Sequence, residues 1–446
     1  MNVEQAVLRR ILPTEEEETR LRVAVASVMD ATRKNIKRLA VKAEPILVGS
    51  VAKGTYLPHP DFDVFVQFPP ETPREELERN GLQIGQFLKN KKKMYAEHPY
   101  TRGTHMGFDV EIVPCFAVAS GDQKMSAVDR TPHHNKYVLS KMRPEQRNEV
   151  RLLKAFMKGI GVYGAESKVQ GFSGYLVELL VLKYGTFRDA LKAVTNWQPG
   201  NVIALDMLPA RVFDEPLIVV DPVDGGRNVA SAVSKEKMAV FIHAAAEYLE
   251  KPRVEFFFPN ERSKQSRKKI IELLKMRGTT LMVTAIRAPK VTDDVLYPQV
   301  RKALRAFEEL YTRHDFSFVR SGFDMVGEDI LFLFEFETFE LPYLKKHVGP
   351  PAWVKNAFDF QAKWEHSRDA LGPPYVEDGL WVVDIKRGQV NAAQLVAVKH
   401  KEMSLGKDLD KEARRLLRAL VGEKALKPSY MRSIGAFLDR RFPWET

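Results

Sequence analysis

Cysteine is nearly absent from this sequence, since Cys115 is the only one among 446 residues. A lone cysteine excludes a disulfide framework and a cysteine-rich zinc site, and it is typical of a reducing compartment. No apolar run approaches the ~20 residues of a membrane-spanning helix. The first residues also lack the apolar segment of a signal peptide. Together with the lack of internal repeats and low-complexity tracts, these absences predict a globular cytoplasmic protein with no membrane partner.

Negative charge is scarcer than positive charge in this chain. The sequence has 58 Asp and Glu against 69 Lys and Arg, which gives a net charge of +11. Such an excess favours a polyanionic partner such as a nucleic acid, although a merely soluble basic protein would show it too. The apolar fraction of 44% is ordinary for a globular protein. The chain is too long to fold around a single hydrophobic core, and its length suggests roughly three domains.

The most informative stretch runs from Val48 to Phe65. A Gly-Ser turn that includes Ser50 follows a short apolar run, and its backbone N–H groups and hydroxyl suit phosphate oxygens. Further on, Asp61 and Asp63 lead into a second apolar run, and the two-residue period of a strand puts both carboxylates on one face. Carboxylates this close repel each other unless a cation lies between them, and hard oxygen ligands suit Mg²⁺. A phosphate-binding turn beside metal-binding carboxylates predicts nucleotidyl transfer.

Either motif alone is a weak indication, because Gly-Ser is common in turns and Asp-x-Asp is common on half-exposed strands. Together, the order strand, Gly-Ser, helix, strand, Asp-x-Asp resembles the signature of the nucleotidyltransferase superfamily. That superfamily includes DNA polymerase beta, poly(A) polymerases and CCA-adding enzymes. A two-metal site of this kind needs a third carboxylate on a neighbouring strand. The alternating segment 107–114 offers Asp109 and Glu111 on one strand face.

Many short runs outside this signature resemble the archaeal (class I) CCA-adding enzymes, in the same order along nearly the whole chain. This resemblance implies that C, C and A are added one at a time to the 3′ end of tRNA, from CTP and ATP and without a nucleic-acid template. The matching runs are Ser126–His134, Asn148–Lys154, Gly161–Glu166, Gly171–Leu176, Val219–Asp224, Arg227–Ala230, Leu296–Gln299, Arg320–Ser321 and Ser404–Lys407.

The resemblance also implies which carboxylates carry the chemistry. The third catalytic carboxylate of the family lies three residues before the proline of a Val-Pro-Cys segment, which is Glu111 here, where the family usually has aspartate. We therefore expect Asp61, Asp63 and Glu111 to be the catalytic residues and the Mg²⁺ ligands. Asp109, two residues earlier on the same strand face, stays a rival for the third position.

The same resemblance assigns a set of nucleotide-binding residues. Ser50, Lys154 and Tyr163 are expected to hold the triphosphate, and Arg227 is expected to contact the base, a task that suits its planar fork. Lys53 either reaches a phosphate or is a solvated helix lysine, and without the resemblance Lys154 would be taken for a surface lysine. The other residues expected to line the nucleotide site are Tyr95, His98, Thr131 and His134.

The expected fold is of the α+β class and has three parts. A catalytic nucleotidyltransferase head of the polymerase beta type, with a mixed sheet, is expected over residues 1–140. A helical, nucleotide-binding neck is expected over 141–255, and a tRNA-binding body and tail over 256–446. The body is expected to be ferredoxin-like, because its strands and helix follow the order β-α-β-β. These elements are expected at 280–286, 297–313, 316–320 and 330–336.

Three further local expectations concern single helices. Thr14 and Glu17 form a capping-box pattern, which predicts a helix from there to about Ala40. An amphipathic helix is expected from Arg74 to about Lys91. A basic amphipathic helix is expected over Lys411–Val421.

The expected partners are CTP, ATP and the top half of tRNA, which consists of the acceptor and T arms. The sequence leaves open whether the protein is a homodimer. Two alternatives for the function also stay open at this point. One is a poly(A) or other terminal ribonucleotidyltransferase, and the other is a non-catalytic RNA-binding protein on the same scaffold.

Overall fold

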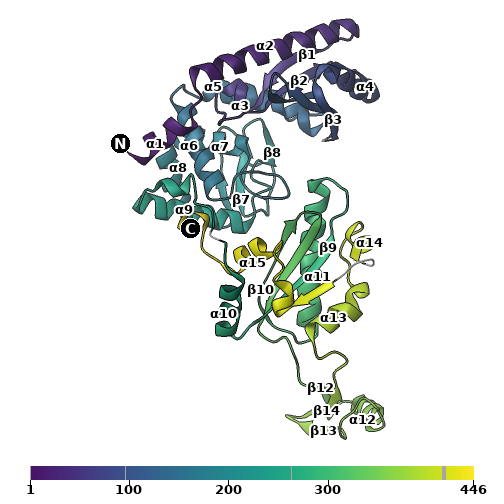
Figure 1. The fold of residues 1–446 in the computed structure, drawn as a ribbon. Coiled ribbons are helices and arrows are strands. Elements are labelled where there is room, and N and C mark those ends of the chain that lie inside the picture. The colour runs from purple at the N-terminus through teal and green to yellow at the C-terminus, as the bar shows by residue number, and fades with distance from the viewer. Residues whose placement is uncertain (1, 96, 263, 414–417) are drawn as a thin grey trace. The chain divides into compact units, whose positions relative to one another are not determined.

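The computed structural model describes residues 2–95, 97–262, 264–413 and 418–446. The chain forms two compact units (Figure 1). The first comprises Met1–Glu261 and Arg441–Thr446, and the second comprises Arg262–Arg440. Both units combine helices with sheets, which confirms the expected α+β class. The three-part division into head, neck and body stays a prediction.

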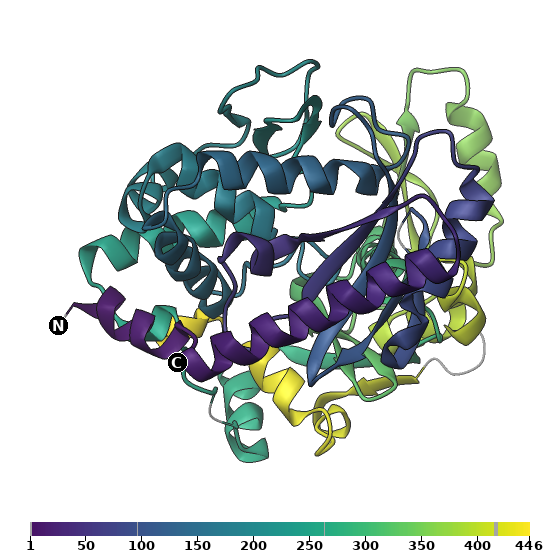
Figure 2. The ribbon, with the colours of Figure 1, turned by 90° about the horizontal axis from the view of Figure 1, so that it is seen from above.

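The first unit contains a five-stranded sheet with the order β1-β2-β5-β4-β3. Strands β2 and β5 run parallel, whereas the other neighbouring pairs run antiparallel. Helices α2 and α4 pack against this sheet around buried side chains such as Leu21, Val64 and Leu77, and Figure 2 shows α2 as the long purple helix. The bounds are β1 Glu44–Val48, β2 Phe62–Phe68, β3 Lys89–Tyr95, β4 Pro99–His105, β5 Phe108–Phe116, α2 Glu15–Arg38 and α4 Arg74–Ile84.

Helix α2 begins where the sequence predicts. The Oγ1 of Thr14 accepts a hydrogen bond from the backbone N–H of Glu17 at 3.2 Å, and the Glu17 carboxylate accepts one from the backbone N–H of Thr14 at 2.8 Å. Two N–H groups that the helix itself leaves unpaired are thus satisfied. The capping box and the helix that follows it are therefore confirmed.

The predicted helix from Arg74 to about Lys91 is wrong in its second half. Helix α4 ends at Ile84, and after a short 3₁₀ turn the residues from Lys89 to Tyr95 form strand β3. This strand lies at the edge of the sheet and carries a run of exposed lysines. Lysines discourage edge strands from pairing with other chains, but such strands lack the alternating apolar pattern that identifies a strand in a sequence.

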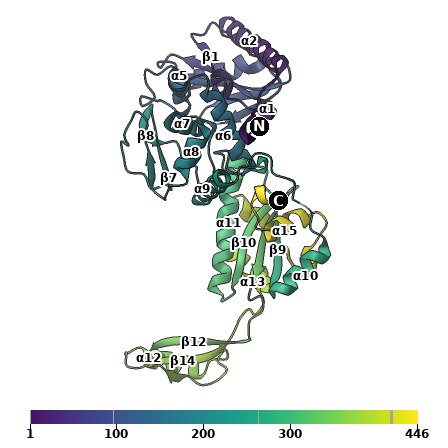
Figure 3. The ribbon, with the colours of Figure 1, turned by 90° about the vertical axis from the view of Figure 1, so that its left-hand side faces the viewer.

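The rest of the first unit is mainly helical, with a small sheet of order β6-β7-β8. Helix α6 passes through its middle, and Val150, Leu153 and Met157 of this helix are buried. Figure 3 shows α6 beside α7 and α8. The bounds are α1 Val3–Ile11, α3 Gly49–Lys53, α5 Thr131–Lys141, α6 Gln146–Gly159, α7 Gly174–Tyr184, α8 Phe187–Val194, α9 Lys235–Glu250, β6 Asn201–Ile203, β7 Leu217–Asp221 and β8 Asp224–Asn228.

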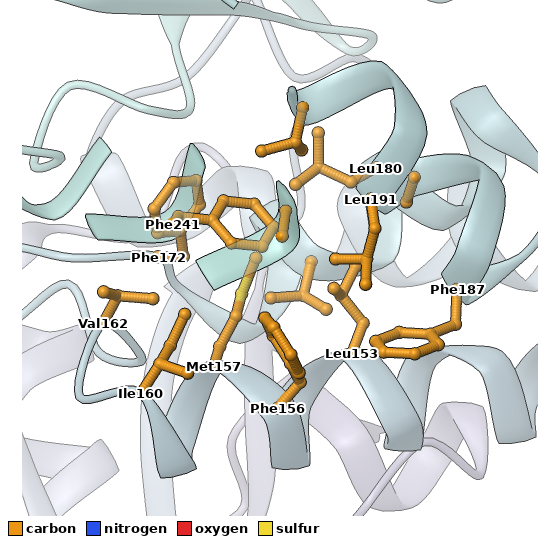
Figure 4. Close-up of a cluster of buried hydrophobic side chains, with 14 of the residues drawn as sticks. Leu153, Phe156, Met157, Ile160, Val162, Phe172, Leu180, Phe187, Leu191 and Phe241 are labelled. Carbon is orange, nitrogen blue, oxygen red and sulfur yellow. The ribbon is translucent and has the colours of Figure 1, made fainter. Parts of the chain in front are cut away.

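Aliphatic and aromatic side chains together form the core of this helical region (Figure 4). The ring of Phe156 lies 5.6 Å from that of Phe187 and 5.4 Å from that of Tyr248, measured between centroids, and both contacts are edge to face. Such pairs add roughly 0.5–1.5 kcal/mol to the effect of burial alone. Leu153 and Met157 point into the same core, so α6 is fixed along its length.

The last residues of the chain also belong to the first unit. Phe442 and Trp444 stack with centroids 4.7 Å apart, and Trp444 is buried. The indole N–H of Trp444 donates to a carboxylate oxygen of Glu247 on α9 at 2.7 Å. The chain therefore returns to the first unit after completing the second.

The second unit contains a four-stranded antiparallel sheet with the order β10-β11-β9-β15. Numbered along the chain, its strands lie in the order 2-3-1-4, and α11 connects the first two. This arrangement confirms the ferredoxin-like expectation. The bounds are β9 Thr280–Arg287, α11 Asp293–Arg313, β10 Phe318–Val326, β11 Asp329–Phe336 and β15 Arg418–Val421.

The predicted helix over Lys411–Val421 is wrong in its last four residues. A short helix, α14, spans Leu409–Ala413, residues 414–417 lie outside the described residues, and Arg418–Val421 form strand β15. Strand β15 pairs with β9, with Arg418 opposite Ala285. A pairing partner more than a hundred residues away decides the conformation here, and local propensity does not reveal it.

A small three-stranded sheet, β12-β14-β13, lies between β11 and α13 in the sequence of the second unit. The remaining bounds are β12 Leu344–Pro351, α12 Ala357–Glu365, β13 Tyr375–Glu377, β14 Leu380–Lys386, α13 Ala392–Lys399, α10 Arg267–Arg277 and α15 Met431–Leu438. Across both units, none of the helices in the described ranges is long and apolar enough to cross a membrane.

Candidate active site

Three carboxylates meet at one end of the first sheet because of the strand register. Asp63 on β2 is paired with Glu111 on the parallel neighbour β5. Residues paired in this way point to the same face of a sheet. Asp61 lies just ahead of β2, two residues before Asp63, and its negative charge acts on Asp63. The sheet thus brings Glu111 beside the Asp-x-Asp pair.

Asp109 lies farther from Asp63 than Glu111 does, close to the turn between β4 and β5. Its side chain is 54% exposed, whereas that of Glu111 is 21% exposed. Arg102 on β4 approaches both, with nitrogen–oxygen distances of 3.5 Å to Asp109 and 3.7 Å to Glu111. The register therefore favours Glu111, and the choice between the two stays a prediction.

The carboxylates face too little positive charge. Burial, followed by the negative charges of Glu111 and Asp61, raises the pKa of Asp63 to about 7. Burial also raises the pKa of Glu111, an effect that Arg102 opposes. Carboxylate oxygens in this state are suitable ligands for a divalent cation. In the described ranges, however, no three acidic, histidine or cysteine side chains converge tightly enough to hold a metal ion as they stand, so binding requires rotamer changes here.

The Gly-Ser turn lies directly against these carboxylates. Gly49 has a φ of +76°, which side chains other than glycine adopt only with strain, and a Cβ atom there would lie 2.7 Å from a carboxylate oxygen of Asp63. Ser50 follows Gly49 in the first turn of α3. Glycine is therefore required at this position both by the backbone and by the approach of Asp63.

A cavity of about 340 Å³ adjoins the turn. All the predicted nucleotide-binding residues except Tyr95 and His98 line it. These side chains come from α3, α5, α6, β8 and the segment before α7. The lining residues are Gly49, Ser50, Lys53, Ala127, Arg130, Thr131, His134, Asn135, Lys154, Tyr163, Ser173, Gly174, Tyr175, Glu178 and Arg227.

One part of the cavity lining carries two buried lysines. The Nζ of Lys53 lies 2.6 Å from a carboxylate oxygen of Glu178, and the Nζ of Lys154 lies 3.3 Å from the other. Both lysines are buried, which excludes the alternative that either is a solvated surface residue. Burial would raise the pKa of Glu178, but the two lysines and Thr55 lower it below its ordinary value. Burial lowers the pKa of Lys154, which Glu178 partly offsets.

Another part of the cavity lining belongs to a cluster around Asp221. Buried Asp221 accepts hydrogen bonds from Nε2 of His134 and from an Nη1 of Arg227, each at 2.7 Å. Burial alone would raise the pKa of Asp221, but these two partners lower it to about 2. His134 also stacks on Tyr175 with ring centroids 4.1 Å apart. The Arg227 guanidinium and the His134 ring are thereby fixed beside the cavity.

Tyr95 and His98 lie elsewhere. Tyr95 is 69% exposed at the end of β3, which is the edge of the sheet opposite β1 and the Gly-Ser turn. His98 is buried against Phe116, and its Nδ1 lies 3.4 Å from Glu78. Strands β2, β5 and β4 separate these residues from the turn. Their expected place in the nucleotide site stays a prediction without support from this arrangement.

Glu178 and Tyr175 lie on the mostly apolar helix α7 and were not predicted as site residues. Asp221 belongs to a run that carried the resemblance, yet no role was assigned to it. A usable signal exists for Glu178, because it is the only charged residue between Gly174 and Leu182. A lone charge in a buried helix requires a partner, so it points to a functional or structural ion pair.

Three family descriptions match successive parts of the chain. "Nucleotidyltransferase domain" matches residues 29–134, "tRNA nucleotidyltransferase, second domain" matches 148–258, and "CCA-adding enzyme, C-terminal domain" matches 277–422. Nucleotidyltransferases generally use a divalent metal. The three matches follow one another along the chain without overlap.

Whole-chain relatives agree with these matches. The CCA-adding enzyme of Methanosarcina barkeri is 39% identical over 411 residues, covering 91% of this chain and 90% of the relative. That of Thermoplasma acidophilum is 36% identical and covers 98% and 99%. A solved structure of the Cid1 poly(U) polymerase is 16% identical with a TM-score of 0.44, covering 56% of this chain and 94% of Cid1, which is too distant to bear on function. The chain therefore belongs to the family of CCA-adding enzymes.

Proposed function

We propose that this protein adds C, C and A in turn to the 3′ end of tRNA, with CTP and ATP as nucleotide donors and pyrophosphate as the product. Family membership supports the reaction. The observation that carries its location is the register that pairs Asp63 with Glu111, together with the close approach of Gly49 to Asp63. The phosphate-binding turn and the acidic residues then lie at the same end of the sheet.

Asp61, Asp63 and Glu111 would hold the divalent cation, and Mg²⁺ suits their hard oxygen atoms. When bound, the cation neutralises phosphate charge and makes the attacking hydroxyl more acidic. The raised pKa of Asp63 supports this assignment, because a carboxylate pressed against two others is relieved by a shared positive charge. Asp109 remains the rival of Glu111.

The Ser50 turn, Lys53, Lys154 and Tyr163 hold the triphosphate with its α-phosphate beside the carboxylates. The 3′ hydroxyl oxygen of the tRNA forms a bond to the α-phosphorus as the bond to the pyrophosphate oxygen breaks. The two lysines balance the charge of the triphosphate to a similar degree before the transfer and as pyrophosphate leaves. The protein thus contributes positioning and charge rather than covalent chemistry.

We expect the base to be selected by the residues around Asp221. Asp221 fixes the guanidinium of Arg227, whose planar donors suit the edge of a base. Thr131 and His134 also line the cavity, and Tyr175 supports the His134 ring. We infer that these side chains, with the RNA itself, replace a template strand.

The tRNA substrate is expected to be gripped at its acceptor and T arms by the second unit. Helix α10 presents Arg267, Lys268, Lys269 and Lys275 as exposed residues. Positive side chains of this kind suit phosphates and 2′-hydroxyls of duplex RNA, and such binding weakens with salt. A homodimer and a cytoplasmic location also stay proposals.

The test is nucleotide incorporation on a tRNA that lacks its last three nucleotides. With CTP followed by ATP, growth should stop after CCA, and the D61N variant should incorporate no nucleotide. Unlimited growth with ATP alone would instead indicate a poly(A)-type enzyme. Salt-sensitive tRNA binding without any incorporation would indicate a non-catalytic RNA-binding protein.

A further inference from the structure

Glu178 is the one acidic residue in an otherwise apolar helix, α7, and its side chain is 1% exposed. Burying a carboxylate is costly unless partners satisfy it. Its partners come from three other segments of the first unit, namely α3, the loop after it, and α6. Those segments also form the wall of the cavity next to Ser50. A negative charge where these segments meet can therefore fix the side chains that line the cavity.

The carboxylate of Glu178 accepts hydrogen bonds from three side chains. One of its oxygens accepts from Lys53 Nζ at 2.6 Å, and the other accepts from Thr55 Oγ1 at 2.6 Å and from Lys154 Nζ at 3.3 Å. Lys154 additionally donates to the backbone carbonyl of Thr55 at 3.1 Å and to its hydroxyl at 3.2 Å. The cluster carries two positive charges and one negative charge.

The two lysines differ in how many donors the protein occupies. An ammonium group has three N–H donors. Those of Lys154 are matched by three acceptors on Thr55 and Glu178. Lys53 has a single hydrogen-bond partner in the described part of the chain, which is Glu178. Two of its donors are therefore left for a ligand on the cavity side.

The surroundings leave little room for these groups to move. A Cβ atom at Gly174, at the start of α7, would lie 3.0 Å from the hydroxyl of Tyr163 and 3.7 Å from Lys154 Nζ. Lys154 is thus packed between α7, Tyr163 and Thr55. The negative charge of Asp63 offsets part of this excess positive charge. Both lysines also line the cavity, where Ser50 and Tyr163 are the neighbours expected to hold the triphosphate.

We propose that Glu178 is a positioning residue for the triphosphate: it fixes the ammonium groups of Lys53 and Lys154 behind the Ser50 turn, so that Lys53 presents its free N–H donors to phosphate oxygens. Lys154 supports the same oxygens by its charge. The inference rests on the proposed function, because it names how that site binds its nucleotide. A positioning role for Glu178 follows neither from the Gly-Ser and Asp-x-Asp motifs nor from its place in the cavity lining alone.

The first experiment replaces the carboxylate by an amide of the same shape. E178Q keeps a partner for the Thr55 hydroxyl but leaves the lysines without an opposing charge. We expect the KM for CTP and for ATP to rise about tenfold, because both nucleotides share the triphosphate and charge-assisted hydrogen bonds are lost. The kcat should change by less than about threefold, because binding of the triphosphate in the ground state is what is weakened. E178D, which retains the charge, should recover part of the affinity.

Inhibition by pyrophosphate and by cytidine distinguishes a positioning role of Glu178 from a general loss of structure in the variant. Inhibition by pyrophosphate should weaken in E178Q by about the same factor as the KM rises, whereas inhibition by the nucleoside cytidine should stay unchanged. The matched control is E4Q, since Glu4 is another largely buried glutamate of the first unit, bound to Arg188 and Tyr248. E4Q should lower the thermal unfolding midpoint without changing the KM for CTP.

A double-mutant cycle with K53M keeps the inference testable if E178Q is less stable. If Glu178 acts through Lys53, adding E178Q to K53M should change the KM for CTP much less than it does in the wild type. Full additivity would overturn the proposal, and so would an unchanged KM or an equal weakening of pyrophosphate and cytidine. If the wild type failed to extend truncated tRNA at all, the proposed function would fall instead, so the two failures are distinguishable.

Discussion

Gly49 shows how much of the active site depends on a single residue. Its φ of +76° and the 2.7 Å approach of Asp63 both exclude a side chain. We expect G49A to lower the rate of CTP incorporation by more than about a hundredfold, because small displacements at a reacting centre have effects of this size. Single-turnover incorporation on truncated tRNA is the measurement.

The control for this substitution is G278A. Gly278 has a similar φ of +66°, but no atom lies within 4 Å of the position of its Cβ. It should share the backbone cost of about 1–2 kcal/mol in stability and keep the incorporation rate. Equal losses of rate in both variants would show that the approach of Asp63 to the turn is irrelevant.

Asp221 links stability to pH. Its pKa is lowered to about 2 from an ordinary 3.8, so its stabilising effect is fully present above pH 3.8 and is lost as the pH falls towards 2. At pH 7 we expect D221N to reduce the free energy of unfolding by about 2 kcal/mol, which is the equivalent of this shift. Denaturant titrations at several pH values should show the deficit narrowing between pH 4 and pH 2. A deficit that is constant over this range would contradict the assignment.

The sequence predicts part of the site residue by residue, for a physical reason. Ser50, Asp61 and Asp63 lie close together in the chain, so a strand period and a turn suffice to bring them together. Lys154 and Arg227 were reached through the resemblance. Glu178 could not be paired with Lys53 in advance, because 125 residues separate them and only the tertiary fold brings their side chains into contact.

At the scale of elements, local signals give helix starts reliably. Thr14 is exposed and acts on α2 alone, so its contribution can be measured. We expect T14A to lower the free energy of unfolding by about 1 kcal/mol, because one helix N–H loses its acceptor. Thermal unfolding of T14A and of T19A, a substitution within the same helix, gives the comparison. A loss in T19A as large as that in T14A would show that removal of any threonine side chain from this helix, and not the loss of the cap, lowers the stability.

Two strands mark where such local signals fail. Strand β3 has the polar composition of an edge and none of the alternation of a half-buried strand, and β15 has residues that suit a helix equally well. Both are strands because a partner supplies hydrogen bonds, β4 in one case and β9 in the other. The βαββ order of the second unit was predictable, since its long apolar runs carry the signal themselves.

At the scale of the whole molecule, the first unit incorporates the final residues of the chain. Trp444 is buried there and donates to Glu247. We expect W444A to destabilise the first unit by about 3–5 kcal/mol, the usual cost of removing a large buried aromatic side chain. Limited proteolysis should then cut within the first unit sooner than in the wild type.

The matched control for W444A is W353A, because Trp353 in the second unit is largely exposed. This variant should leave the proteolysis of the first unit unchanged. Equal resistance of W444A and the wild type would mean that the last residues contribute nothing to the core of the first unit.

The return of the chain to the first unit has a consequence for biosynthesis. The ribosome makes all of Arg262–Arg440 before it makes Trp444, although the core that receives Trp444 is encoded almost entirely upstream. Folding during translation proceeds from the N-terminus. The first unit of a nascent chain therefore cannot complete its core until synthesis is almost over, because Trp444 is among the last residues made.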